Sequence, residues 1–299
     1  MKKRFFILLF LSLIFFYGSS EASQKILSLQ SFRVQPYEDA IRGFKKTCDC
    51  KIKESLILES NDSDVGERIR KINPDLILAI GLDALLKVKE INEIPIVYLM
   101  VLDPASVLSG KKNITGISMN IPSEIQLRIF QKTLPDAKRI GLIFDLVNTG
   151  LFVKGAREAA KTIGVQLITK EVHSAKDVPS LISAMKADID AFWMLPDTTV
   201  ISSETVEFLV LFSIEHKIPI FTFSERFVET GALMSLSFDA FELGKRAGEM
   251  ARDILSGKDI RDIPRADVTD VIISISPNMA RKLGITIPDE ILNKAKIVH

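Results

Sequence analysis

The chain has 299 residues, of which 47% are hydrophobic and 26% are charged. These proportions are those of a globular protein, so extensive disorder is not expected, and the length suits one large domain or two moderate ones. The formal net charge of +1 gives no sign of the basic face or stripe that nucleic-acid binding requires, so we expect no nucleic-acid partner.

Residues 1–22 have the three-part pattern of a secretory signal peptide. Basic residues at positions 2–4 precede an apolar run at 5–17, and the small residues Ser20 and Ala22 favour cleavage after Ala22. The alternative is a membrane anchor, but a bilayer span needs about 20 apolar residues and this run is shorter. No cysteine lies near the cleavage point, so lipid attachment is not expected. We therefore expect a free protein in the periplasm.

Short apolar runs alternate with helix-like segments along the rest of the chain. The first series includes "KILSLQ", "DLILAIG" and "IPIVYLMV", and a second series includes "RIGLIFD", "IDAFWML" and "IPIFTF". Strands that read as continuous Ile, Leu and Val runs are buried on both faces, and helices between them impose parallel pairing. The pattern predicts an α/β protein with two doubly wound parallel-sheet lobes.

The two series meet at "NITGISMNIPSE" (113–124), where Gly116 and Pro122 interrupt the pattern. The last part of the chain adds a strand and a long helix, then another strand and a short helix. We therefore expect three crossings between the lobes, near 116–121, 233–239 and 266–276. Such a three-strand hinge lets two lobes close around a ligand.

These crossings define the expected domains. After the signal peptide at 1–22, the N-terminal lobe should comprise 23–117 plus 238–266. The C-terminal lobe should comprise 118–237 plus 267–299. Each lobe then has roughly 100 residues or more, a normal size for a unit with its own core.

Acids and hydroxyls follow the predicted strands in both series, for example at Asp103, Asp197 and Ser224. Ligands of open parallel sheets bind outside the carboxyl ends of the strands, so these residues predict a cleft for a small polar ligand with an ammonium group. Each position also has a simpler explanation: Asp103 before Pro104 is typical of a turn, and Asp83, Asp197 and Thr198 are typical helix N-caps. Trp193, the only tryptophan, lies inside a predicted strand and is expected in the core.

Several segments together resemble a known family. They are "VLDPASVLSGKKNITGIS" (101–118), "LPDTTV" (195–200), "IPIFTFSERFVETGALMSLSFDAFELGKRAGEMARDILSGK" (218–258) and the ending "ISPNMARKLGITIPDEILNKA". In order and spacing the chain resembles the bacterial ABC-transporter substrate-binding proteins that include tryptophan- and tyrosine-binding members, with a type I periplasmic-binding-protein fold. The resemblance implies that loop tips of both lobes enclose one small molecule, often an amino acid, and that the closed form docks on an inner-membrane permease driven by an ATPase.

Carried over by motif, the resemblance implies a set of ligand-facing residues: Ser31, the turn from Gly81 to Ala84 with Asp83, Asp103, Asn148, Asp197, Thr198, Ser224 and Asp239. One departure stands out. Relatives generally have Gly-Thr followed by a small residue or proline at the first of these turns, which supplies a hydroxyl to the ligand's acidic end, whereas this chain has Gly81, Leu82 and Asp83. An acid there would repel a carboxylate. Either Asp83 points away as an N-cap, or the ligand is not a standard free amino acid.

An enzyme is the main alternative of another class. The histidines are His173, His216 and His299, none next to a nucleophile motif, and Gly-x-Ser-x-Gly, His-Glu-x-x-His and Gly-x-Gly-x-x-Gly are absent. A sugar-responsive repressor would need a DNA-binding module where the export signal lies. We expect a monomeric binding protein with no enzymatic activity, no cofactor and no metal. The sequence does not separate transport from presentation of the ligand to a membrane sensor.

Cys48 and Cys50 are separated by one residue. In an oxidising compartment they could form a small disulfide. A soft-metal site would need more ligands than this pair supplies nearby. The expectation is a surface turn that carries either free thiols or a bridge.

Overall fold

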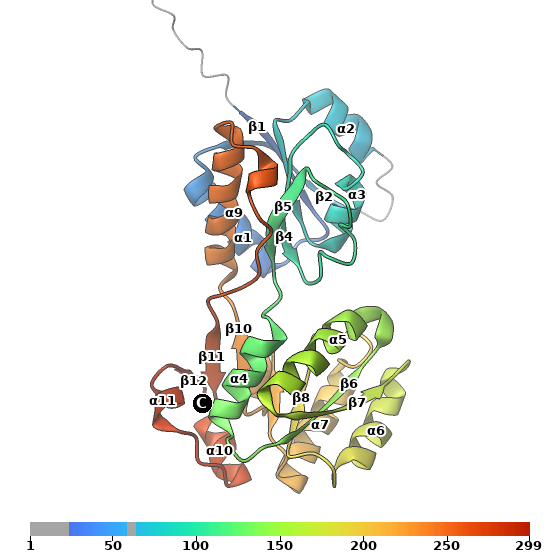
Figure 1. Ribbon diagram of the computed structural model, residues 1–299, viewed down its shortest axis with the longest axis vertical. Helices are drawn as coiled ribbons and strands as arrows, with labels where there is room; N and C mark the ends of the chain where they lie inside the picture. The colour runs from blue at the N-terminus through green and yellow to red at the C-terminus, as the bar shows by residue number, and fades with distance from the viewer. Residues whose placement is uncertain (1–23, 59–63) are drawn as a thin grey trace, which may run out of the picture.

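The computed structural model describes residues 24–58 and 64–299. The predicted signal peptide, 1–22, lies outside the described residues. Two lobes lie one above the other along the longest axis of the molecule and are joined by extended segments (Figure 1). The predicted α/β class with two parallel-sheet lobes is confirmed, with one antiparallel strand pair in the second sheet.

The N-terminal lobe contains an all-parallel sheet in the order β2-β1-β3-β4-β5. Its strands are β1 (Lys25–Gln30), β2 (Lys51–Ile57), β3 (Leu76–Ile80), β4 (Ile96–Val101) and β5 (Ile114–Ser118), and its helices are α1 (Gln35–Cys48), α2 (Val65–Ile72), α3 (Leu82–Val88) and α9 (Ala240–Leu255), with a 3₁₀ turn at Ile260–Asp262. Neighbouring strand residues face opposite layers: Ile26 and Leu78 pack toward α1 and α9, while Leu27 and Ile77 pack toward α2 and α3. Burial on both faces explains why the inner strands β3 and β4 are apolar throughout, whereas the edge strand β2 alternates exposed and partly buried residues.

The C-terminal lobe repeats this winding and extends it. Strands β7-β6-β8-β9-β10 follow the same parallel order, and β11 then pairs antiparallel with β10 and parallel with β12. The strands are β6 (Arg139–Phe144), β7 (Gln166–Glu171), β8 (Ala191–Trp193), β9 (Ile220–Thr222), β10 (Met234–Ser237), β11 (Ile272–Ile275) and β12 (Lys296–Ile297). The helices are α4 (Ser123–Thr133), α5 (Leu146–Ile163), α6 (Val178–Met185), α7 (Ser203–His216), α8 (Glu225–Thr230), α10 (Pro277–Leu283) and α11 (Asp289–Leu292), with a 3₁₀ turn at Ala175–Asp177.

Helix α9 follows a strand of the C-terminal lobe but packs against α1 of the N-terminal lobe (Figure 1). Glycines let the two backbones touch. A Cβ atom at Gly43 would lie 1.9 Å from the carbonyl oxygen of Phe241, and one at Gly244 would lie 1.9 Å from that of Ala40. Because real atoms do not approach so closely, both positions need glycine. The packing of α9 on α1 thus places this helix, which follows a strand of the C-terminal lobe, in the N-terminal lobe.

Three connections join the lobes: residues 119–122 after β5, 238–239 before α9, and 263–271 before β11. The first and third run side by side, because Ser118 donates its N–H to the Ala266 carbonyl at 2.9 Å and Val268 donates to that of Asn120 at 3.2 Å. The Ser118 hydroxyl also donates to the Asp267 carboxylate. We propose that the boundaries of the two lobes lie within these connections.

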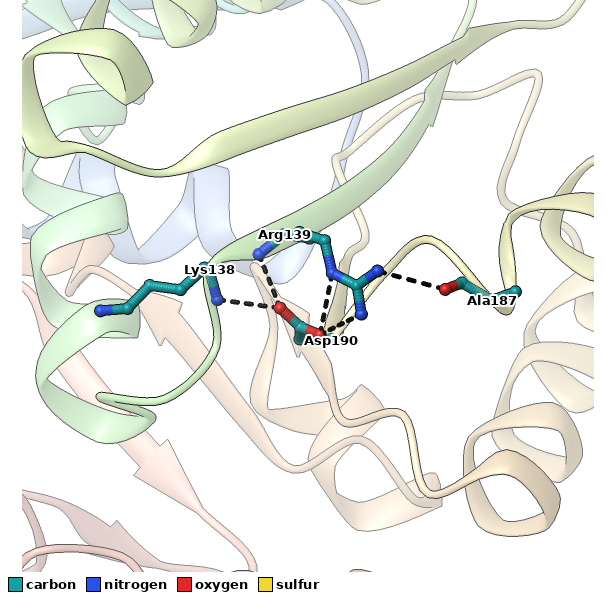
Figure 2. A network of polar contacts seen from close by, with 4 residues as sticks. All are labelled: Lys138, Arg139, Ala187 and Asp190. Atoms are coloured by element: carbon teal, nitrogen blue, oxygen red, sulfur yellow. Dashed lines mark hydrogen bonds and ion pairs between the residues drawn. The ribbon is translucent and has the colours of Figure 1, made fainter.

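A charged clamp fixes the start of β6, at the edge of the C-terminal sheet opposite to its loop tips. Asp190 accepts hydrogen bonds from the backbone N–H groups of Lys138 and Arg139 at 2.9 and 2.8 Å and from the Arg139 guanidinium at 2.6 Å (Figure 2). The guanidinium also donates to the Ala187 carbonyl. Burial raises the pKa of Asp190, but these donors outweigh it and hold the pKa below its ordinary value.

The two cysteines form a disulfide between the end of α1 and the start of β2, with their Cα atoms 5.1 Å apart. The side chain of Cys48 is buried, so the pair is only partly a surface feature. Asp49 between them adopts the left-handed conformation that the tight turn needs. Within residues 24–58 and 64–299, no helix is long and apolar enough to cross a membrane.

Candidate functional site

A cavity of about 560 Å³ lies between the two lobes, beside the connections that join them. The N-terminal lobe supplies residues from the start of α1 and from the end of β4, including Pro36, Met100 and Leu102. The connections contribute Met119, Asn120, Ile121, Phe238 and Asp239, and the C-terminal lobe contributes Thr149, Phe152, Trp193, Phe223, Ser224 and Glu225. The volume is within the range of small-molecule sites.

Aromatic side chains form the wall on the side of the C-terminal lobe. Trp193 at the end of β8 packs edge-on against Phe130 of α4 and Phe152 of α5, with ring centroids 5.4 and 5.5 Å apart. Only 1% of Trp193 is exposed, as its predicted place in the core requires. It nevertheless lines the cavity together with Phe152. The indole therefore serves the core and the cavity wall at once.

The charged residues of the cavity wall are Asp39, Glu225 and Asp239. Asp39 in α1 is paired with Arg42 one turn later. Glu225 at the start of α8 accepts from Lys296 Nζ at 2.7 Å and from the Ser274 hydroxyl at 2.9 Å. The bond from Lys296 lowers the pKa of Glu225 against the effect of burial, so this carboxylate is ionised near neutral pH.

Asp239 caps α9: it accepts from the backbone N–H groups of Phe241 at 2.8 Å and Glu242 at 3.3 Å. Because it lies in the short connection from β10 to α9, the same carboxylate borders the cavity. Asn120 lies in the neighbouring connection, and its side-chain oxygen is buried without a partner among the described residues. The connecting segments thus supply polar groups as well as the joint between the lobes.

The predicted residue Asp197 is fully buried and is not part of the cavity wall. Its carboxylate accepts from the N–H of Asp145 at 2.8 Å, the hydroxyl of Thr149 at 2.6 Å and the side chain of Asn148 at 3.2 Å. The N–H groups of Thr199 and Val200 also donate to it, at 3.0 and 3.4 Å.

This network ties the loop after β8 to the start of α5. Asn148 also donates to the Thr199 hydroxyl at 3.0 Å, and that hydroxyl donates to Asp145 at 2.9 Å. Thr198 is exposed. The helix that follows, α7, is capped by Ser202 and not by Asp197, so the expected N-cap role of Asp197 is wrong and its carboxylate instead holds the loop after β8. Ligand contact by Asp197, Asn148 or Thr198 stays a prediction.

Four predicted residues lie at the carboxyl edge of the N-terminal sheet, outside the wall of this cavity. The Ser31 hydroxyl accepts from the N–H of Ala84 in the first turn of α3, at 3.0 Å. Gly81 has φ +89°, and a Cβ there would lie 2.5 Å from the Ser31 hydroxyl oxygen. Asp83 is exposed and, among the described residues, takes part in no hydrogen bond or ion pair. Asp103 accepts from the N–H of Ser106 at 3.3 Å, as a turn requires.

Burial raises the pKa of the nearby Tyr37 phenol to about 12, and the charge of Asp83 adds to this effect. The Phe32 ring stacks on Tyr37 with centroids 5.0 Å apart. This edge of the lobe therefore carries an aromatic pair beside an acid. Of the predicted ligand residues, Ser224 and Asp239 line the cavity, and the others are not part of its wall.

Sequence reasoning missed several residues of the cavity wall, among them Asp39, Asn120, Phe152 and Glu225. Asp39 and Phe152 lie inside helices, one turn or more beyond the strand ends at which ligand residues of parallel sheets are expected. Asn120 lies in the predicted crossing at 116–121, and a polar residue in a segment beside the cleft could have indicated a ligand contact. Glu225 directly follows the predicted Ser224.

The family model for ABC transporter substrate binding proteins matches residues 43–299. The chain belongs to this family. Its members are binding proteins and not enzymes, which confirms the expected class. Within the part of the chain that the structure describes, no group of three or more His, Cys, Asp or Glu side chains is arranged to hold a metal ion.

A "Tyrosine-binding protein" of Clostridioides difficile (strain R20291) is 32% identical over an alignment of 193 residues that covers 61% of this chain. The match spans about half, 55%, of the length of that relative.

Two solved structures cover almost the whole chain. The ligand-free, open structure of a substrate-binding protein with adhesive properties from Clostridium difficile is 24% identical, with a TM-score of 0.76 over 92% of this chain and 99% of that one. An ABC domain from Streptococcus pneumonia in complex with L-Trp is also 24% identical, with a TM-score of 0.69 over 93% of this chain and 100% of that one. The fold is that of type I periplasmic binding proteins, as the sequence predicts.

Proposed function

We propose that this protein is the extracytoplasmic solute-binding component of an ABC importer. It binds one small molecule, an amino acid or a related compound, between its lobes and delivers it to a permease in the inner membrane. The observation that carries the proposal is the 560 Å³ cavity bordered by both lobes and by the connections between them. A ligand held by both lobes favours their closed arrangement, because closing adds contacts.

The cavity wall suits a ligand with an apolar body and a few polar groups. Trp193, Phe152 and Phe223 present aromatic surface, while Asn120, Ser224 and Asp239 supply hydrogen-bonding groups around it. Sites for small molecules generally combine these two kinds of lining. The names of the relatives, one a tyrosine-binding protein and one crystallised with L-Trp, support a ligand of this size.

The permease, the periplasmic location and the monomeric state belong to the same proposal. Family membership supports the permease and the location, since a substrate-binding protein of an ABC transporter acts outside the cytoplasm and hands its ligand to a membrane partner. The predicted signal peptide at 1–22 supplies the route. Fractionation of cells that express the full chain tests the location, and light scattering of the purified protein tests the monomeric state.

Native mass spectrometry and a thermal-shift screen test ligand binding. We expect a small molecule to copurify at one per chain, and we expect the melting temperature to rise with ligand concentration by binding linkage. Trp193 gives an independent signal, because the only tryptophan of the chain lines the cavity. Chemical turnover of the bound molecule, or saturation that leaves Trp193 emission unchanged, would contradict the proposal.

A further inference from the structure

The charged side chains that line the cavity are all acidic: Asp39, Glu225 and Asp239. They come from α1, from the start of α8 and from the connection before α9, so they surround the space from both lobes. No lysine, arginine or histidine is part of the described wall. A ligand that enters the cavity therefore meets carboxylates and no cationic side chain.

The cations that pair with two of these acids face the solvent. Arg42 is 67% exposed whereas its partner Asp39 is 29% exposed, and Lys296 is 61% exposed whereas Glu225 is 29% exposed. Asp239 has no cationic partner within 4.0 Å among the described residues, and its bonds are to backbone N–H groups of α9. Asp39 and Glu225 thus line the cavity, whereas Arg42 and Lys296 are not part of its described wall.

A second observation, at Asn120, also favours a ligand that donates hydrogen bonds. The side-chain oxygen of Asn120 is a buried hydrogen-bond acceptor without a partner in the described structure, and Asn120 lines the cavity. A buried acceptor without a donor is costly, so this position favours a ligand that brings N–H groups. An ammonium group has three donors and no acceptor.

A carboxylate on the ligand would find few partners. Helix N-termini at the cleft could bind an anion, but side chains already occupy several of them. Asp145 accepts from the first turn of α5, Asp239 from that of α9 and Ser31 from that of α3. The starts of α1 and α4 have no side-chain cap, and each has an acid in its first turn, Glu38 and Glu124. Like charges disfavour a carboxylate there.

We propose that the cavity selects a cationic amine with an apolar or aromatic body and no carboxylate. The acids and the Asn120 oxygen hold the ammonium group, and the wall around Trp193 and Phe152 covers the body. This inference rests on the proposed function, because it names the class of ligand for the same cavity.

The test is a titration of Trp193 emission with three compounds that share one phenyl body: phenethylamine, phenylalanine and 3-phenylpropionate. The pair 3-methylbutylamine and leucine repeats the comparison with an aliphatic body. We expect each amine to bind at least tenfold more tightly than the matching amino acid, and the acid to bind weakest. Equal or tighter binding of the amino acids overturns the proposal and leaves the proposed function standing.

Variants locate the ammonium group. Glu225→Gln and Asp239→Asn should each weaken amine binding about tenfold, and Asn at position 239 can still cap α9. Glu229→Gln is the matched control, because Glu229 is exposed one turn later in α8 and lies outside the cavity wall. Melting temperatures of all three variants show whether each is folded.

Equal losses in the control and in the two cavity variants overturn the assignment. Absence of a saturable response to either amine also overturns it. The proposed function is then judged separately, by the molecule that copurifies with the protein.

Discussion

Replacing Asp197 should destabilise the C-terminal lobe, since this carboxylate organises the loop after β8. Five donors converge on it, from Asp145, Asn148, Thr149, Thr199 and Val200, and the side chain has no exposed surface. Asp197→Ala leaves these donors without an acceptor. In Asp197→Asn one oxygen remains, but the new NH₂ group meets donors that previously pointed at the second oxygen.

The magnitude follows from the kind of bond lost. A hydrogen bond to a charged group contributes about 1.5–3 kcal/mol, and removing one partner from a buried charged arrangement costs about 3–5 kcal/mol. Because the five donors share one carboxylate and can partly reach other acceptors, their contributions do not add. We expect Asp197→Ala to cost about 3–5 kcal/mol and Asp197→Asn about half of that.

Urea denaturation monitored by circular dichroism measures the loss in the free energy of unfolding. At about 2–4 °C per kcal/mol, the melting temperature of Asp197→Ala should fall by about 10 °C. Thr198→Ala is the matched control: Thr198 is the neighbouring residue and is exposed, so its free energy of unfolding should stay within about 0.5 kcal/mol of the parent.

A different result would support direct ligand contact by Asp197. If Asp197→Ala keeps its stability within about 0.5 kcal/mol, the typical range of a surface substitution, and still loses ligand affinity, the role of Asp197 in holding this loop is refuted. The residue would then belong to the ligand site, as the resemblance implies.

Two further predictions concern the contact of Asp190 with Arg139 and the packing of α1 against α9. Asp190→Asn should cost about 1–2 kcal/mol, because it removes the charge that Arg139 contacts. The pKa of Asp190 is lowered in the folded state, so its contribution is present above the ordinary value of about 4 and is lost as the pH falls through the lowered value. Urea denaturation against pH measures this, and equal acid sensitivity of the variant and the parent would contradict it. Gly244→Ala should lower the melting temperature, because the new methyl group would lie 1.9 Å from the Ala40 carbonyl oxygen and α1 and α9 would have to separate. Gly155→Ala in α5 meets nothing within 4 Å and should instead stabilise by about 0.5–1 kcal/mol, so a loss at both positions would point away from helix packing.

Much of the fold follows from local sequence patterns. The apolar runs of β3 and β4 and the helix-like segments between strands predict parallel sheets, because only two-sided burial requires such continuous apolar strands. The antiparallel direction of β11 could not be predicted in this way. An apolar strand reads the same in either direction, and its orientation depends on the route that the chain takes through the third connection.

The site was harder to predict than the fold. The position of Asp197 at the end of β8 was foreseeable from its neighbours, but the direction of its carboxylate depends on Asp145 and Thr149, about 50 residues earlier in the chain. Trp193 shows the same limit: an apolar residue in a strand predicts burial, whereas its contact with the cavity depends on how the two lobes meet. Pairings over such distances are set by tertiary packing and not by local pattern.

The central claim is that the lobes close around one bound ligand. Spin labels at Lys87→Cys in α3 and Lys154→Cys in α5 would report the distance between the lobes, since both positions are exposed and, among the described residues, the native cysteines are joined to each other. Double electron–electron resonance should show one distance between the labels without ligand and a shorter distance at saturation. Half of the molecules should show the shorter distance at the ligand concentration that half-saturates the change in Trp193 emission. A distance that stays constant while Trp193 emission saturates would contradict the account.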